Sequence, residues 1–212
     1  MTDPNSSAAD AAIVHIVDDD APLASALESL FRSVGLQART YGSTDEFLNA
    51  KHEDRPGCLV LDIRLPGVSG LDFQGKLAEL GIGLPVVLMT GHGDIPMSVR
   101  GMKAGAVDFL AKPFRDQDML DAVAIGIERD RERRAASADE ADLKARYATL
   151  SPREKEVMAL VITGKMNKQV AYDLDLSEIT VKIHRGSAMR KMEARTLPDL
   201  VRMGEALKIK AS

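Results

Sequence analysis

The chain has 212 residues, of which 45% are hydrophobic, 28% charged and 4% aromatic, and its formal net charge is −4. This length suits two small domains or one large one, and the single Cys58 excludes an intramolecular disulfide framework. The charge is uneven: residues 1–149 carry a net −8 and residues 150–212 a net +4, which predicts two domains with different partners. The basic excess is too small to establish nucleic-acid binding by itself.

Residues 1–12 are small and polar, and they lack both the basic region and the apolar core of a secretory signal. We expect a short disordered tail here. No apolar run approaches the roughly 20 residues that span a bilayer, which predicts no membrane association. A lone cysteine suits a reducing compartment, so the expected location is the cytoplasm.

Residues 13–127 alternate between short β-rich runs and longer stretches with helical spacing, which predicts a doubly wound, flavodoxin-like α/β domain with a five-stranded parallel sheet. The runs are Ile13–Val17, Gln37–Tyr41, Cys58–Leu61, Pro85–Met89 and Asp108–Leu110. The helical stretches are Pro22–Val34 and four others that start near Ser43, Ser69, Pro96 and Asp116. Cys58 is expected to be a small buried side chain in its strand.

Residues 128–147 are rich in charge and alanine and contain neither glycine nor proline. This composition predicts a solvent-exposed helical linker, with pairing to a second copy as the alternative.

Residues 148–212 show only helical patterns. Ser151, Pro152 and Glu154 form a helix start, a second helix covers Asn167–Leu174, and Ser177 opens a third that runs to about Met192. A fourth helix begins near Leu197. The short turn between the second and third helices predicts an all-α, four-helix domain that contains a helix-turn-helix.

Polar residues follow the strand runs of the first domain. Asp18 and Asp19 come after the first run, Asp62 after the third and Thr90 after the fourth, and Lys112 follows the fifth. The carboxyl ends of parallel strands share one edge of a sheet, where ligands bind, so these side chains should converge.

Such a cluster has a specific chemistry. Like-charged carboxylates raise one another's pKa, and a hard cation such as Mg²⁺ relieves the repulsion. A carboxylate nucleophile, Mg²⁺, the Lys112 ammonium and the Thr90 hydroxyl are the parts needed to receive a phosphoryl group. Any one aspartate taken alone reads better as a turn former or a helix cap, but their joint occurrence favours a site.

Four runs resemble the receiver domain of two-component response regulators: VHIVDDD at 14–20, LDIRLPG at 61–67, MTGHGD at 89–94 and DFLAKPF at 108–114. The resemblance implies that Asp62 is the phosphoacceptor and that Asp19, Asp62 and the Arg64 backbone carbonyl bind Mg²⁺, with Asp18 contacting it through water.

In the same resemblance Thr90 and Lys112 bind the phosphoryl oxygens, and Phe109 rotates together with Thr90. The bond between Lys112 and Pro113 is expected to be cis. The implied partner is a sensor histidine kinase. His92 is expected to be a loop residue and not a ligand.

The second half resembles the LuxR-type helix-turn-helix domain, through LSPREKEV at 150–157, GKMNKQVA at 164–171 and LSEITVKIHR at 176–185. The third helix of such domains enters the major groove of double-stranded DNA. Its spacing points Lys182, Arg185, Gly186 and Ser187 at the groove and turns Val181 and Met189 inward, with Ala188 near the boundary. Further candidates, for phosphate contacts or packing, are Lys168, Thr180, His184, Arg190 and Lys191.

The phrases TGHGDIPMSVRGMKAGAVDF, VKIHRGSAM and LPDLVRM are similar to the FixJ subgroup, mostly transcription activators. The resemblance implies promoter DNA and RNA polymerase as partners, and a homodimer that forms on phosphorylation through a face containing Val99, Met102, Lys103 and Asp108. Such a protein is not an enzyme, apart from its own phosphoryl transfer and autodephosphorylation.

Three alternatives stay open. A phosphatase working through a phosphoaspartate would usually need a second aspartate at position 64, where this chain has arginine. A LuxR regulator that senses a small molecule would need a pocket domain in place of the phosphoacceptor motifs. A response regulator that is no longer phosphorylated would not need the complete set of aspartates, threonine and lysine.

Overall fold

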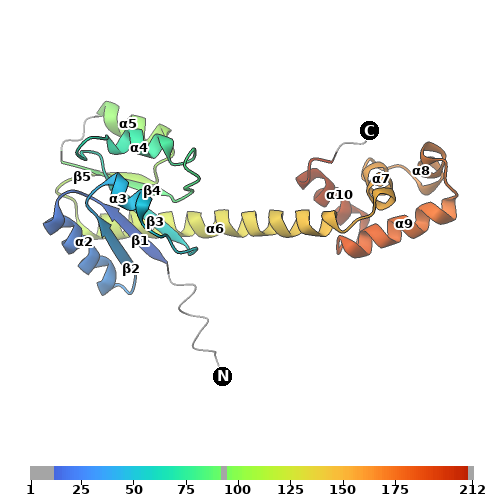
Figure 1. Ribbon diagram of the computed structural model, residues 1–212, viewed down its shortest axis with the longest axis horizontal. Coiled ribbons are helices and arrows are strands. Elements are labelled where there is room, and N and C mark those ends of the chain that lie inside the picture. The colour runs from blue at the N-terminus through green and yellow to red at the C-terminus, as the bar shows by residue number, and fades with distance from the viewer. Residues whose placement is uncertain (1–11, 92–94, 210–212) are drawn as a thin grey trace, which may run out of the picture. The chain divides into compact units, whose positions relative to one another are not determined.

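The computed structural model describes residues 12–91 and 95–209. The expected disordered tail, apart from Ala12, lies outside the described residues, and so does His92. The chain divides into two compact units, one up to Arg134 and one from Ala135. Figure 1 shows a unit of strands and helices and a unit of helices alone.

The first unit holds one parallel sheet in the order β2-β1-β3-β4-β5 (Figure 1). Its strands are β1 (Ile13–Val17), β2 (Gln37–Tyr41), β3 (Gly57–Asp62), β4 (Val86–Thr90) and β5 (Asp108–Ala111). This confirms the predicted doubly wound architecture, with strand limits within one residue of those expected at every end. β1, β3 and β4 are buried along their whole length, because helices cover both faces of the sheet.

The helices of this unit are α2 (Ala21–Ser33), α3 (Thr44–Asn49), α4 (Gly70–Lys76), α5 (Ile95–Lys103) and α6 (Asp116–Ala148). Local sequence fixes where several begin. The Asp20 side chain accepts a hydrogen bond from the Leu23 amide at α2, and the Ser43 hydroxyl accepts one from Glu46 at α3.

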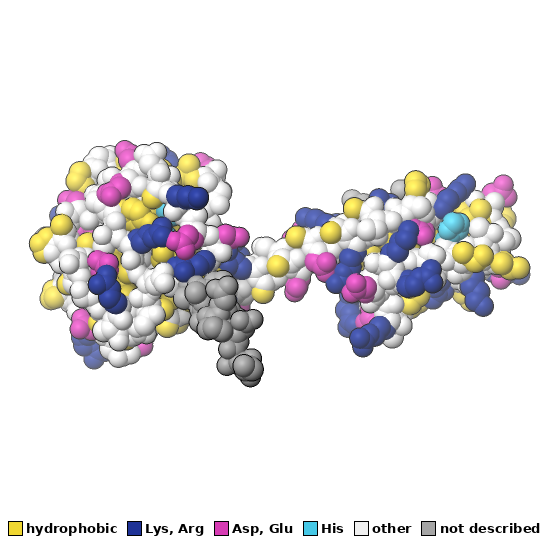
Figure 2. All heavy atoms as spheres, turned by 60° about the horizontal axis from the view of Figure 1, so that its bottom comes forward, with side chains coloured by type: hydrophobic (Ala, Val, Ile, Leu, Met, Phe, Trp, Pro, Cys, Tyr) yellow, Lys and Arg dark blue, Asp and Glu magenta, His cyan; other side chains and the backbone are white. Residues whose placement is uncertain are grey.

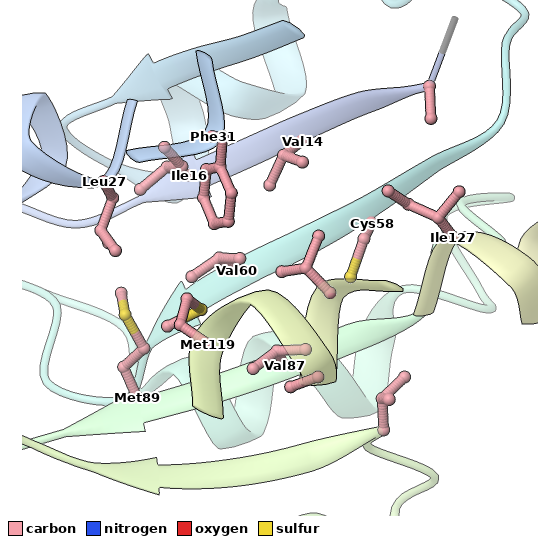
Figure 3. Packing of buried hydrophobic residues seen from close by; sticks show 14 of the residues in the cluster. Val14, Ile16, Leu27, Phe31, Cys58, Val60, Val87, Met89, Met119 and Ile127 are labelled. Atoms are coloured by element: carbon pink, nitrogen blue, oxygen red, sulfur yellow. The ribbon is translucent and has the colours of Figure 1, made fainter. Parts of the chain in front are cut away.

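Two hydrophobic clusters lie on opposite faces of the sheet. In one, Phe31 of α2 and Met119 of α6 pack against Ile16, Val60 and Val87 of the sheet (Figure 3). In the other, α3 and α4 contribute Phe47 and Phe73, which pack with Leu59, Leu61 and Leu88. Alternate residues of each central strand therefore serve opposite clusters, and this holds the strand ends in register.

The second unit has four helices besides the end of α6: α7 (Pro152–Val161), α8 (Asn167–Leu174), α9 (Glu178–Lys191) and α10 (Leu197–Ala206). Ser151 and Glu154 form the predicted capping box of α7, and Ser177 caps α9. Three residues join α8 to α9, the first being Asp175 with φ of 52°. The helix-turn-helix is therefore confirmed.

The linker stretch is helical, because α6 continues through it to Ala148. The expectation that its side chains are solvent-exposed is wrong at Asp130, Leu143 and Tyr147, and Arg134 and Arg146 are also only partly exposed. Asp130 is fully buried in the first unit, and Leu143 and Tyr147 pack against the hydrophobic core of the second. Within residues 12–91 and 95–209, no helix is both long enough and apolar enough to cross a membrane.

Candidate functional sites

Three carboxylates meet at the carboxyl edge of the sheet. Asp18 and Asp62 are buried and Asp19 is exposed, and each offers an oxygen that lies within 4.8 Å of the others. Strand register brings the two buried residues together, because β1 and β3 are direct neighbours that end side by side. The convergence predicted from the sequence is therefore present in the fold.

Lys112 joins two of these carboxylates. Its Nζ donates to Asp18 Oδ2 at 2.7 Å and to Asp62 Oδ2 at 2.6 Å, with only 19% of the lysine side chain exposed. Burial alone would lower the pKa of Lys112, but the hydrogen bonds and charges of the two aspartates outweigh it and raise that pKa. The ammonium is therefore held charged next to Asp62.

For Asp18 the surroundings disfavour the charged form. Burial raises the pKa of the Asp18 carboxyl, and the charge of Asp62 adds to the effect, although Lys112 and the Asp20 amide oppose it. A single lysine thus leaves the charge of the cluster incompletely balanced. An all-oxygen donor set with excess negative charge fits a hard divalent cation such as Mg²⁺.

The loop after β3 completes the surroundings of Asp62. The Arg64 amide donates to Asp62 Oδ1 at 3.0 Å, and the backbones of Arg64 and Ser69 pair in antiparallel fashion across the loop. A Cβ atom at position 70 would lie 2.2 Å from the Asp62 carbonyl oxygen, so only glycine lets α4 start this close to the site. An open hollow lined by Asp19, Arg64 and Met97 lies beside this loop.

The remaining predicted residues of this site lie on β4 and β5. Thr90 is fully buried at the end of β4 and is in register with Ala111, next to Lys112. Phe109 is partly buried and packs against the second cluster, as Met97 of α5 does. The Lys112–Pro113 peptide bond is cis, as expected.

The predicted dimer face is exposed. Val99 and Met102 are each 45% exposed on α5, and Lys103 and Asp108 lie open to solvent beside them. Sequence reasoning missed Ile95, which is 80% exposed. Its spacing of four residues from Val99 on the same helix is the signal that would have found it.

The second helix of the helix-turn-helix, α9, which is the third helix of the four-helix domain, presents a basic face. Lys182, Gly186 and Arg190 are exposed, and so is Lys168 of α8. Several dark blue Lys and Arg side chains lie beside yellow hydrophobic ones on the visible surface of this unit (Figure 2). Figure 2 therefore agrees with a cationic but not uniformly polar surface.

Other predicted contact residues are engaged within the unit. Arg185 is half-buried and donates to Asn167 Oδ1 at 3.0 Å, while Lys191 donates to Glu154 Oε2 at 2.6 Å. Thr180, His184 and Ser187 are partly buried. Val181 is buried and Met189 packs inward as predicted, whereas Ala188, expected near the boundary, is fully buried because α9 turns it into the core.

Sequence reasoning also missed two residues of α9, namely Ile179 and Ile183, which are 73% and 62% exposed. The signal was the phase of the helix. Val181 and Ala188 are seven residues apart and mark the buried side, which leaves residues 179 and 183 on the other.

A doubly wound sheet with a carboxylate cluster at its carboxyl edge, followed by a helix-turn-helix unit, defines a two-component response regulator that controls transcription. Comparison with protein families matches residues 14–124 to the response regulator receiver domain. Residues 148–204 match the luxR family of bacterial regulatory proteins. The chain belongs to the FixJ-type response regulators, with a receiver domain and a LuxR-type DNA-binding domain.

Individual relatives support the same family assignment. Nodulation protein W of Bradyrhizobium diazoefficiens is 59% identical over 201 residues, covering 95% of this chain and 88% of that protein. Transcriptional regulatory protein FixJ of Rhizobium meliloti is 43% identical over 193 residues, covering 91% and 95%. The solved structure of the response regulator StyR is 43% identical, with a TM-score of 0.82 and coverage of 92% and 98%. Response regulators that combine a receiver domain with a LuxR-type DNA-binding domain are transcription factors and not classical enzymes.

Proposed function

We propose that Asp62 accepts a phosphoryl group from the phosphohistidine of a sensor kinase and that this controls DNA binding by α9. The observation that carries the proposal is the Lys112 ammonium, which lies 2.6 Å from the Asp62 carboxylate and is shared with Asp18. An Asp62 oxygen attacks phosphorus, the bond from phosphorus to the histidine nitrogen breaks, and an acyl phosphate forms.

The neighbouring residues have separate roles. Asp19, Asp62 and the Arg64 carbonyl would hold Mg²⁺, with Asp18 reaching it through water. When bound, Mg²⁺ supplies positive charge to the transferring oxygens. Lys112 pairs with the new phosphoryl charge, and the Thr90 hydroxyl donates to a phosphoryl oxygen. The buried position of Thr90 at the strand end supports this role.

The switch then acts on the surface of α5. Movement of Thr90 toward the phosphoryl group is accompanied by Phe109, which packs against the same hydrophobic cluster as Met97 of that helix. The rearranged face, with Val99, Met102, Lys103 and Asp108, pairs with the same face of a second copy. Its exposed apolar side chains support an interface of this kind.

Dimerisation raises affinity for paired DNA half-sites. Two recognition helices about 34 Å apart match one turn of DNA. Once one helix is bound, the second binds without a further loss of translational and rotational entropy, because it is already held near its half-site. Lys182, Gly186 and Arg190 face the groove, with Lys168 near the phosphates; Thr180, His184, Arg185, Ser187 and Lys191 border the contact. We further propose that the protein acts in the cytoplasm and activates transcription with RNA polymerase. The FixJ relative is named a transcriptional regulatory protein, which supports the role in transcription alone.

Light-scattering mass tests the proposal, with Mg²⁺ and beryllofluoride added to wild type, Asp62→Asn and Asp121→Asn. Asp121 is an exposed carboxylate on α6 and serves as the matched control. Wild type and Asp121→Asn should double in mass, and Asp62→Asn should not. If Asp62→Asn also doubles, or wild type does not, the proposed switch is wrong.

A further inference from the structure

Two isoleucines stand out on the recognition helix α9. Ile179 is 73% exposed and Ile183 is 62% exposed, although isoleucine is among the residues most often buried. They are four residues apart and therefore lie one above the other on the same side of the helix. Together they form a small apolar strip, which we call the isoleucine strip.

The isoleucine strip is not part of the domain core. The core side of α9 is made by Val181, Ala188 and Met192, each fully buried. Neither isoleucine belongs to that cluster or to the hydrophobics packed against it. The strip therefore faces outward by the phase of the helix and not through a packing defect.

Its surroundings indicate what covers it. Lys182 lies between the two isoleucines in sequence, and Lys182 and Arg190 are both exposed on this helix. A Cβ atom at Gly186 would meet no atom within 4 Å, so the next turn can approach a flat surface closely. Apolar atoms flanked by cations suit a polyanion that also displays apolar groups.

Duplex DNA has one such group in its major groove. The C5-methyl of thymine is the apolar feature of the base edges there, and aliphatic side chains contact it. Residues four apart on a helix are about 6 Å apart along its axis, close to the rise of two base pairs. The strip can thus touch methyl groups on nearby base pairs.

We propose that Ile179 and Ile183 read thymine methyl groups, so that the preferred half-site has thymine at one or two nearby positions facing α9. The inference rests on the proposed function, in which α9 enters the major groove. It adds a source of base specificity that does not depend on the cationic side chains.

The test uses the full chain with Mg²⁺ and acetyl phosphate. A binding site is first selected from random duplex DNA, and each thymine is then replaced in turn by deoxyuridine, which lacks only the methyl group. Loss of one buried methyl should weaken wild-type binding about 4-fold at the contacted positions. Ile179→Ala and Ile183→Ala should each abolish the penalty at their own thymine.

Tyr172→Ala is the matched control. Tyr172 is 88% exposed on α8, but it borders a hollow shared with Glu156 and Ala159 of α7 and not the strip. This variant should still bind more weakly when a contacted thymine is replaced by deoxyuridine. The isoleucine variants should also keep the dependence of affinity on salt, because neither side chain contacts a phosphate.

The experiment separates a failure of methyl readout from a failure of DNA binding. Selected DNA whose affinity is unchanged by uracil at every thymine would overturn the isoleucine inference and leave DNA binding intact. Failure of the full chain to select any DNA, with or without acetyl phosphate, would overturn the proposed function itself. A uracil penalty that survives in both isoleucine variants would assign methyl readout to other residues.

Discussion

His15 should make the receiver domain less stable in mild acid than at neutral pH. Its side chain is 2% exposed in β1, and its Nδ1 lies 3.0 Å from the Tyr41 hydroxyl. Burial, with the nearby His52 and the charges of Arg39 and Arg55, lowers the pKa of His15 from 6.5 to about 4. The folded state therefore holds a neutral imidazole where the unfolded chain takes up a proton.

The lowered pKa of His15 makes the free energy of unfolding depend on pH. Between pH 6.5 and about 4 the unfolded chain binds more protons at this site, so the free energy of unfolding falls as the pH falls through that window. A difference of this size is worth about 3 kcal/mol once both states are protonated. The part lost between pH 7 and pH 5 is about 2 kcal/mol.

The assay compares wild type with His15→Gln in urea at pH 7 and pH 5, using the native amide signal of Val60 in β3 to report on the receiver domain alone. Other groups, including Asp18, titrate in both proteins and cancel in the difference. Wild type should lose about 2 kcal/mol more than the variant. Equal losses, or a His15 pKa near 6.5 by NMR titration, would refute the reasoning.

Two further changes test the packing of α6. A Cβ atom at Gly126 would lie 2.5 Å from the Sγ of buried Cys58, so Gly126→Ala should lower the free energy of unfolding by about 1 to 3 kcal/mol. Gly75→Ala, where nothing lies within 4 Å, should instead be neutral or stabilise by about 0.5 kcal/mol; equal urea midpoints would contradict this. Asp130→Ala should cost about 3 kcal/mol by removing a fully buried ion-pair partner, against under about 0.5 kcal/mol for exposed Asp121→Ala. A similar urea midpoint for both aspartate variants would show that the buried contacts contribute nothing.

The burial of Asp130 could not be predicted from the sequence. It lies in a run of charged residues without glycine or proline, a composition typical of a solvated helix. In the fold its carboxylate accepts hydrogen bonds from the Gly57 amide and from Arg133 and Arg134. The Gly57 amide lies 73 residues away in the sequence, and no local pattern reports such a partner.

The recognition helix shows the same limit. Its start at Ser177 was predictable because a cap depends on residues three apart. Which of its side chains face outward depends on α7 and α8, against which it packs. Helical spacing therefore reveals neither the hydrogen bond from Arg185 to Asn167 nor the exposure of the isoleucine strip.

Sequence patterns were enough to predict the sheet, the strand limits to within one residue, and the meeting of Asp18, Asp62 and Lys112. Strand periodicity and the shared carboxyl edge of parallel strands are local and topological rules that need no coordinates. The fold was needed to reveal that Asp130 is buried, that Lys112 bridges two carboxylates, and that Ile179 and Ile183 are exposed. Burial and pairing depend on what packs opposite a residue, and that partner comes from a distant part of the chain.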